Sequence, residues 1–212
     1  MAAEQYAEVL DDLRTAYDGQ VAAREQMPLA PWKEPLRARF LERLWAEGRR
    51  SLLELGAGPG THGRYFADAG LEVVCTDLSP AMVEACRAKG LQAIVADFLS
   101  LPARLAEPLD AAFALNCLLH VPPDDLPRVL GAIRDVLVPG GLFFLGQYGG
   151  IDFHGVRASD TYEPKRYFSF LPDAALRALV EVDFDVLDFA IVELPYPDEP
   201  DVHVQALTLR RR

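Results

Sequence analysis

The sequence is short of cysteine and of basic residues. Its three cysteines, Cys75, Cys86 and Cys117, form no CxxC pair and no metal-ligand spacing. This argues against a disulfide framework or a metal site and favours a reduced, cytoplasmic setting. Lys and Arg number 21 against 32 Asp and Glu, so the net charge is −11. Because nucleic acids are bound by basic faces, this balance argues against a nucleic-acid partner.

Long apolar runs are also missing. No run approaches the roughly 20 residues that a membrane span requires, so we expect no membrane partner. The start of the chain, MAAEQYAEVLDD, lacks the basic and apolar regions of a signal peptide.

What is present is a chain of 212 residues, 50% of them hydrophobic, which predicts one globular domain. From Ser51 onward, short apolar runs alternate with helical stretches. The predicted strands are 51–55, 71–76, 92–96, 110–115 and 141–147, and the predicted helices between them are 61–69, 80–89 and 123–137. Strands that are apolar on both faces are typical of a parallel sheet covered by helices on both sides. The sequence therefore predicts a doubly wound α/β fold.

Before Ser51 the sequence predicts a helical extension. One amphipathic helix is predicted over 4–25 and a second over 35–47, after a proline-containing stretch. We expect residues 1–49 to close over a ligand as a lid, in which Tyr17, Arg24 and Trp32 are candidates for ligand contact.

After residue 147 the alternation stops. Residues 148–170 carry no clean period, and a helix is predicted over 172–182. Strands at 184–194 and 202–211 follow, with only a proline-rich link (195–201) between them, which predicts an antiparallel pair at one end of the sheet. We expect 50–147 to form the ligand-binding core and 148–212 to shape a substrate pocket.

The strongest local signal is LLELGAGPGTHG, residues 52–63, where an apolar strand runs into a glycine-rich turn and a helix. Glycines permit the tight turn and the close approach of a ligand to the backbone. Asp77 ends the next strand, 17 residues after Gly60, where a carboxylate can accept two hydrogen bonds from a ribose diol. The dinucleotide fingerprint GxGxxG would need glycine at Thr61. These residues indicate a nucleoside-type ligand, either a dinucleotide or S-adenosylmethionine.

Five motifs, taken in order, resemble those of the class I S-adenosylmethionine-dependent methyltransferases, and most closely their small-molecule members. They are ELGAGPGT, TDLS, ADF, ALNCLLHVP and VPGGLFF. The resemblance covers residues 50–147. It implies a Rossmann-like seven-stranded sheet of order 3-2-1-4-5-7-6 with strand 7 antiparallel, S-adenosyl-L-methionine as cofactor and S-adenosyl-L-homocysteine as product.

The resemblance also implies a cofactor site. The turn at 56–58 would pass under the methionine and ribose, Asp77 would hold the ribose hydroxyls, and the backbone carbonyl of Asn116 would hold the ammonium group. The implied residues are Glu54, Gly56, Ala57, Gly58, Asp77, Leu78, Met82, Asp97, Phe98 and Asn116.

Several of these residues have a structural alternative. Asp97, implied to accept from the adenine amino group, is also a typical cap before Phe98, whose amide is implied to face the ring. Met82, implied with Leu78 to lie against the adenine, also fits a core position. We interpret Cys117 as a buried structural thiol rather than a nucleophile.

The run NCLLH at 116–120 bears on the methyl acceptor. Family members that methylate exocyclic amines of bases or glutamine side chains carry an Asn/Asp-Pro-Pro-Tyr/Phe run there. Its absence favours a small-molecule acceptor with an oxygen or nitrogen nucleophile. His120 lies at the ligand-binding edge of the sheet and is the candidate catalytic base. Candidate substrate contacts are Tyr17, Trp32, His154, Arg166 and Tyr167.

Two other functions stay open at this point. An NAD(P)-dependent oxidoreductase shares the fold class, but the glycine spacing and Asp97 disfavour it. A non-catalytic methyltransferase-like partner subunit would keep the same motifs. Either a monomer or a homodimer is compatible with the sequence.

Overall fold

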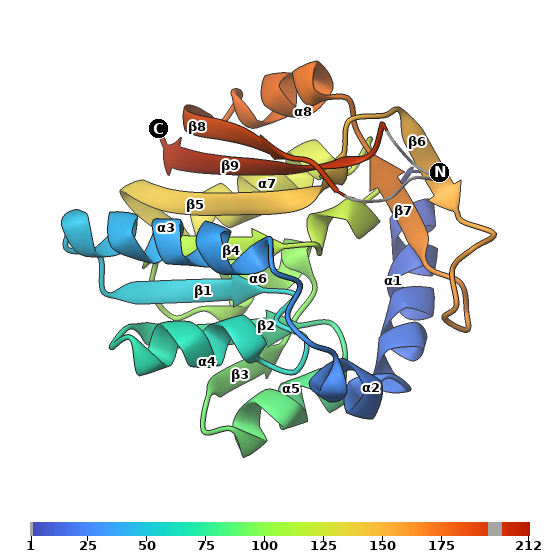
Figure 1. Ribbon diagram of the computed structural model, residues 1–212, viewed down its shortest axis with the longest axis horizontal. Helices are drawn as coiled ribbons and strands as arrows, with labels where there is room; N and C mark the ends of the chain where they lie inside the picture. The colour runs from blue at the N-terminus through green and yellow to red at the C-terminus, as the bar shows by residue number, and fades with distance from the viewer. Residues whose placement is uncertain (1, 195–200) are drawn as a thin grey trace.

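A central seven-stranded sheet organises the computed structural model, which describes residues 2–194 and 201–212 (Figure 1). The strand order is β3-β2-β1-β4-β5-β9-β8. The strands are β1 (Ser51–Leu55), β2 (Glu72–Asp77), β3 (Gln92–Val95), β4 (Leu109–Leu115), β5 (Leu137–Gly149), β8 (Phe184–Val192) and β9 (His203–Arg211). The neighbouring strands from β3 through β2, β1 and β4 to β5 pair in parallel. Strand β9 is antiparallel to both β5 and β8. The predicted strand order and the antiparallel last strand are confirmed.

Helices cover both faces of the sheet. They are α1 (Ala2–Asp18), α2 (Val21–Gln26), α3 (Lys33–Ala46), α4 (Thr61–Asp68), α5 (Pro80–Ala88), α6 (Leu101–Arg104), α7 (Leu126–Asp135) and α8 (Asp173–Val180), with the 3-10 turns η1 (Phe98–Ser100) and η2 (Leu118–His120). On one face α3, α4 and α5 bury Phe40, Phe66 and Cys86, and on the other α7 and α8 bury Leu130 and Leu176. The parallel strands are therefore buried from both sides, as their apolar runs predicted.

Helices α1 and α2 lie across the edge at which the parallel strands end, and a small hairpin lies beside them (Figure 1). The hairpin pairs β6 (Phe153–Val156) with β7 (Tyr167–Phe170). In doubly wound sheets this carboxyl edge is where ligands bind. Among the described residues, no helix has both the length and the apolar character needed to cross a membrane.

The N-terminal region contains two helices where one was predicted over 4–25. The chain turns at Gly19 and Gln20, between α1 and α2. Asp18, at the end of α1, accepts hydrogen bonds from the Ser79 hydroxyl and from the amide of Ala81 (3.3 Å). These bonds attach the end of α1 to the start of α5.

Two other helices differ from the prediction at their ends. Helix α3 begins at Lys33, two residues earlier than expected, because a proline is well tolerated in the first turn of a helix. Helix α7 begins at Leu126 rather than at position 123, because residues 122–125 form a turn in which the Asp125 amide donates to the Pro122 carbonyl (3.0 Å).

Two strand features also differ from the prediction. The turn expected at 139–141 lies inside β5, where the ladder with β4 is irregular between the pairs Leu109–Leu137 and Ala111–Leu142. Residues 148–170 contain the β6–β7 hairpin, whose four-residue strands are too short to give an alternating signal. The predicted link at 195–201 lies outside the described residues except for its last position.

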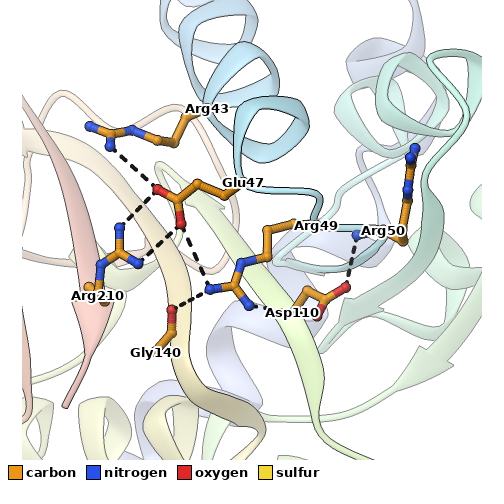
Figure 2. A network of polar contacts seen from close by, with 7 residues as sticks. All are labelled: Arg43, Glu47, Arg49, Arg50, Asp110, Gly140 and Arg210. Atoms are coloured by element: carbon orange, nitrogen blue, oxygen red, sulfur yellow. Dashed lines mark hydrogen bonds and ion pairs between the residues drawn. The ribbon is translucent and has the colours of Figure 1, made fainter.

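A charged network closes the opposite end of the sheet, where β1 begins (Figure 2). The Glu47 carboxylate accepts both guanidinium hydrogen bonds of Arg210, at 3.1 and 2.8 Å. The guanidinium of Arg49 lies 3.8 Å from the same carboxylate and donates to the carbonyl of Gly140 (2.8 Å). The network therefore joins the end of α3 to β5 and β9.

We expect Glu47→Gln to lower the free energy of unfolding by about 1.5–3 kcal/mol, the range for hydrogen bonds to charged groups. Burial alone would raise the pKa of Glu47, but Arg210, Arg43 and Arg49 outweigh it and lower the pKa. The contribution is therefore present above the unfolded-state pKa and is lost as the pH falls. Urea denaturation at pH 7 and pH 4 measures it. Glu181→Gln, which breaks an exposed α8 pair with Arg177, is the control and should change stability by less than about 0.5 kcal/mol.

Candidate functional site

The glycine turn after β1 uses backbone conformations that favour glycine. Gly56 and Gly58 have φ values of +58° and +55°, a region that L side chains rarely adopt. The Ala57 amide donates to the Thr76 carbonyl (2.9 Å), and the Gly58 amide donates to Asp77 Oδ2 (2.8 Å). These bonds attach the turn to the end of β2.

A smaller cavity of about 80 Å³ lies beside this turn. Its polar wall contains the carboxylates of Asp77 and Asp97, and its apolar wall contains Leu78, Ala96 and Phe98. Burial raises the pKa of Asp77, while the amides of Ser79 and Gly58 oppose the shift. Asp97 Oδ1 accepts the amides of Leu99 and Ser100 at 2.9 and 3.1 Å. The predicted capping role is thus present, and Oδ2 of Asp97 has no hydrogen-bond partner among the described residues.

A larger cavity of about 310 Å³ adjoins the smaller one. Both are lined by Tyr17, Arg24, Gly56, Asn116 and His120. The larger cavity extends between the glycine turn, the segment from α2 to the start of α3, and the β6–β7 hairpin. The pair of cavities therefore offers two adjoining compartments at the carboxyl edge of the sheet.

A polar chain crosses the junction of the two cavities. Asp160 binds the guanidinium of Arg166 through both carboxylate oxygens, at 3.1 and 2.6 Å. Arg166 Nη1 donates to the Tyr17 hydroxyl (3.0 Å), which lies 2.8 Å from His120 Nε2. His120 Nδ1 lies 2.6 Å from the carbonyl of Tyr167. Because a carbonyl only accepts, Nδ1 carries the proton and Nε2 accepts from Tyr17.

The surroundings of His120 in this hydrogen-bonded series favour a neutral imidazole. Burial lowers the pKa of His120 to about 4, and the charge of Arg166 adds to this effect. Burial also raises the pKa of Tyr17, although Arg166 and Arg24 oppose the shift. At neutral pH, Tyr17 therefore donates and His120 accepts.

The structure brings most of the predicted site residues to the two cavities. The smaller cavity collects Gly56, Gly58, Asp77, Leu78, Asp97, Phe98 and Asn116. Ala57 and Arg166 line the larger cavity, and Tyr17 and His120 line both. Glu54 lies behind the turn, where it is 2% exposed and accepts from Cys75 Sγ (3.4 Å), so it supports the turn without lining a cavity.

Four predicted contacts are placed elsewhere. Met82 is 0% exposed and lies in the core, because it belongs to the buried face of α5 with Val83 and Cys86. Trp32 packs edge-on against Tyr148 and lines neither cavity. His154 is exposed on β6. Tyr167 contributes its carbonyl to His120 rather than its ring to a cavity.

Two other residues have structural roles. Cys117 is buried, its thiol donates to the Leu55 carbonyl (3.2 Å), and burial raises its pKa, which disfavours the thiolate. His203 Nε2 lies 2.9 Å from Asp173 and links β9 to α8. Among the described residues, no group of three or more His, Cys, Asp or Glu side chains could hold a metal ion.

Several lining residues were missed by the sequence interpretation. Leu10 and Leu13 of α1 line the smaller cavity, and Lys33 and His62 line the larger one. The spacing of the leucines predicted a buried helix face but not what it faces. Burial lowers the pKa of His62 to about 3.

Comparison with known proteins agrees with this architecture. A family model described as a methyltransferase domain matches residues 52–141, the segment that contains the glycine turn and both carboxylates. The chain belongs to the class I S-adenosylmethionine-dependent methyltransferases. The cofactor of this methyltransferase is therefore S-adenosylmethionine.

Curated relatives of the chain have different activities. The ubiquinone/menaquinone biosynthesis C-methyltransferase of Acidiphilium cryptum is 31% identical over 163 residues, which are 71% of this chain and 61% of that protein. The carboxy-S-adenosyl-L-methionine synthase of Pseudomonas putida is 32% identical over 128 residues, 53% of this chain and 49% of that protein. The chain thus matches about half to three-fifths of the length of these relatives.

A solved methyltransferase structure shares the fold over the full chain. The 1,6-didemethyltoxoflavin-N1-methyltransferase of Burkholderia thailandensis superposes with a TM-score of 0.73 and 24% identity, covering 100% of this chain and 91% of that one. At this level of identity, the likeness supports the fold alone.

The groups that line the smaller cavity match the chemistry of the family's cofactor. Asn116 adopts a φ of 59°, and its buried Oδ1 has no hydrogen-bond partner among the described residues. Together with the free Oδ2 of Asp97, it leaves acceptors of the kind that amino and ammonium groups satisfy. The apolar wall of Leu78 and Phe98 suits a flat base.

Proposed function

We propose that this chain transfers the methyl group of S-adenosylmethionine to a small-molecule acceptor. The observation that carries the proposal is the pair of adjoining cavities, in which a carboxylate-walled compartment beside the glycine turn lies next to a separate space of about 310 Å³. A site of that volume suits a small ligand. The relatives include C- and O-methyltransferases. For this chain we favour an oxygen or nitrogen nucleophile, because the hydrogen-bonded side chains of Tyr17 and His120 lie at the junction and offer a base.

The smaller cavity would hold the cofactor in a defined orientation. Asp77 would accept from the ribose hydroxyls, Asp97 Oδ2 from the adenine amino group, and Leu78 and Phe98 would flank the base. The ammonium group would lie near Asn116. Bound in this way, S-adenosylmethionine supplies a methyl group on a sulfonium, and the protein mainly has to align the acceptor with it.

The Tyr17–His120 pair would take the proton of the acceptor. Tyr17 oxygen accepts one bond from Arg166 and donates its own proton toward His120 Nε2, which leaves one lone pair for an acceptor O–H or N–H. As the acceptor loses its proton to Tyr17, the tyrosine proton moves to Nε2. The resulting imidazolium keeps its Nδ1 proton on the Tyr167 carbonyl, so charge and protons balance within the chain.

Binding calorimetry separates this proposal from the oxidoreductase alternative. We expect S-adenosylhomocysteine to bind and NAD to show no measurable binding. Incubation with S-adenosylmethionine carrying a labelled methyl group and a metabolite mixture should then label a small molecule. Binding without transfer to any acceptor would favour the non-catalytic partner subunit.

Asp77→Ala should weaken S-adenosylhomocysteine binding by at least about 1.5 kcal/mol, the lower value for a hydrogen bond to a charged group. Calorimetry measures the change. Because Asp77 also holds the amides of Gly58 and Ser79, thermal denaturation must show that the variant is folded. An unchanged affinity in a folded variant would remove Asp77 from the site.

A further inference from the structure

The larger cavity is basic although the protein as a whole is acidic. Three cationic side chains line it, Arg24, Lys33 and Arg166, and no Asp or Glu is among its lining residues. The chain carries a net charge of −11, so this concentration of positive charge runs against the overall balance. A ligand in the cavity would meet a positive potential.

Two of the three cations have no internal counter-ion. Arg166 is neutralised by Asp160 at 2.6 Å. Among the side chains described in residues 6–194 and 201–212, however, neither Arg24 nor Lys33 makes an ion pair or side-chain hydrogen bond; Arg24 lies over the Tyr17 ring at 5.6 Å and Lys33 over the Trp32 ring at 5.4 Å. Both side chains are half-buried, and desolvation together with Arg24 lowers the pKa of Lys33 to about 8. The larger cavity therefore offers two cations that an anionic ligand can pair with.

The positions of the two cations separate their roles. Arg24 lines both cavities and lies 3.8 Å from the place where a Cβ on Gly58 would be, so its charge acts on both compartments. Lys33 lines the larger cavity only. Removing the charge of Lys33 should thus change the binding of the acceptor and not that of the cofactor.

Part of the uncharged wall is aromatic. Tyr17, Tyr162 and Phe168 line the larger cavity together with Tyr148. Aromatic walls bind flat apolar rings through their faces and edges. We infer that the larger cavity takes a small aromatic carboxylate as the methyl acceptor, with Lys33 binding the carboxylate group. This inference rests on the proposed methyl transfer and specifies its substrate class.

The experiment uses the full chain saturated with S-adenosylhomocysteine and two matched probe pairs. Benzoate is compared with benzamide, and 2-naphthoate with 2-naphthamide, by isothermal titration calorimetry. We expect each carboxylate to bind at least tenfold more tightly than its amide. Lys33→Gln should remove that preference and weaken carboxylate binding at least tenfold, while binding of the amides and of S-adenosylhomocysteine stays within twofold. Lys165→Gln makes the same change of charge on a residue that lines neither cavity, and should preserve the preference.

The outcomes distinguish this inference from the proposed function. Equal affinity for each carboxylate and its amide would overturn the anionic acceptor while the cofactor still binds. A loss of S-adenosylhomocysteine affinity in Lys33→Gln equal to the loss for the carboxylates would assign Lys33 to the cofactor and also overturn it. Failure of the wild-type protein to bind S-adenosylhomocysteine would overturn the proposed methyl transfer itself.

Discussion

Gly58→Val should abolish S-adenosylhomocysteine binding while leaving the protein folded. A Cβ on Gly58 would meet only Nη2 of Arg24, at 3.8 Å, so the protein itself has room for a side chain. That room belongs to the smaller cavity, which both residues line, and a valine there would occupy volume needed by the cofactor. Overpacking a fitted site typically costs about 1–3 kcal/mol, and the upper end of that range corresponds to a loss of about 100-fold in calorimetry.

Backbone strain must be separated from this loss of space. Gly58 has a φ of +55°, and a side chain in that region costs about 1–2 kcal/mol. Gly90→Val is the matched control, because Gly90 has a φ of +75° and an added Cβ would meet nothing within 4 Å. We expect both variants to lose a few degrees of thermal stability and only Gly58→Val to lose binding. Wild-type affinity in Gly58→Val would show that the turn is purely structural.

The five parallel strands followed from the local pattern of the sequence, whereas the strand order was implied by the resemblance to the methyltransferase family. Apolar runs separated by helices are typical of a parallel sheet, and two strands without an intervening helix favour an antiparallel pair. The hairpin at 153–170 did not follow. Its strands are short, and its position depends on contacts with η2 and β5 rather than on its own periodicity.

The cofactor side of the site was more predictable than the acceptor side. Gly56, Gly58 and Asp77 stand at strand ends, so the topology alone places them at the same edge. Lys33 and His62 reach the larger cavity only because α3 and α4 pack beside the glycine turn, and no local pattern marks such a contact. His154 shows the converse, since its place in an irregular segment suggested a pocket and the hairpin instead exposes it.

His120→Ala should depress turnover by about 10²–10⁴-fold, the usual cost of losing a general base. Its affinity for S-adenosylhomocysteine should change little, because binding of the cofactor needs no base. His120→Gln should be almost as slow, since an amide can accept the Tyr17 hydrogen bond but cannot hold the proton. Tyr17→Phe removes the other half of the pair and should cause a loss of similar size, because neither group then relays a proton.

The pH dependence and a control variant test this role of His120. With its pKa near 4, the imidazole is unprotonated throughout the neutral range and stays available as a base. Protonation of His120 should therefore lower turnover only as the pH approaches 4. His154→Ala, an exposed histidine on β6, should retain wild-type turnover. If His120→Ala and Tyr17→Phe both react within a few-fold of the wild type on the acceptor that the labelling experiment finds, no base is used. Catalysis would then depend on proximity and orientation alone, and the acceptor must be a nucleophile that reacts without losing a proton in the transition state.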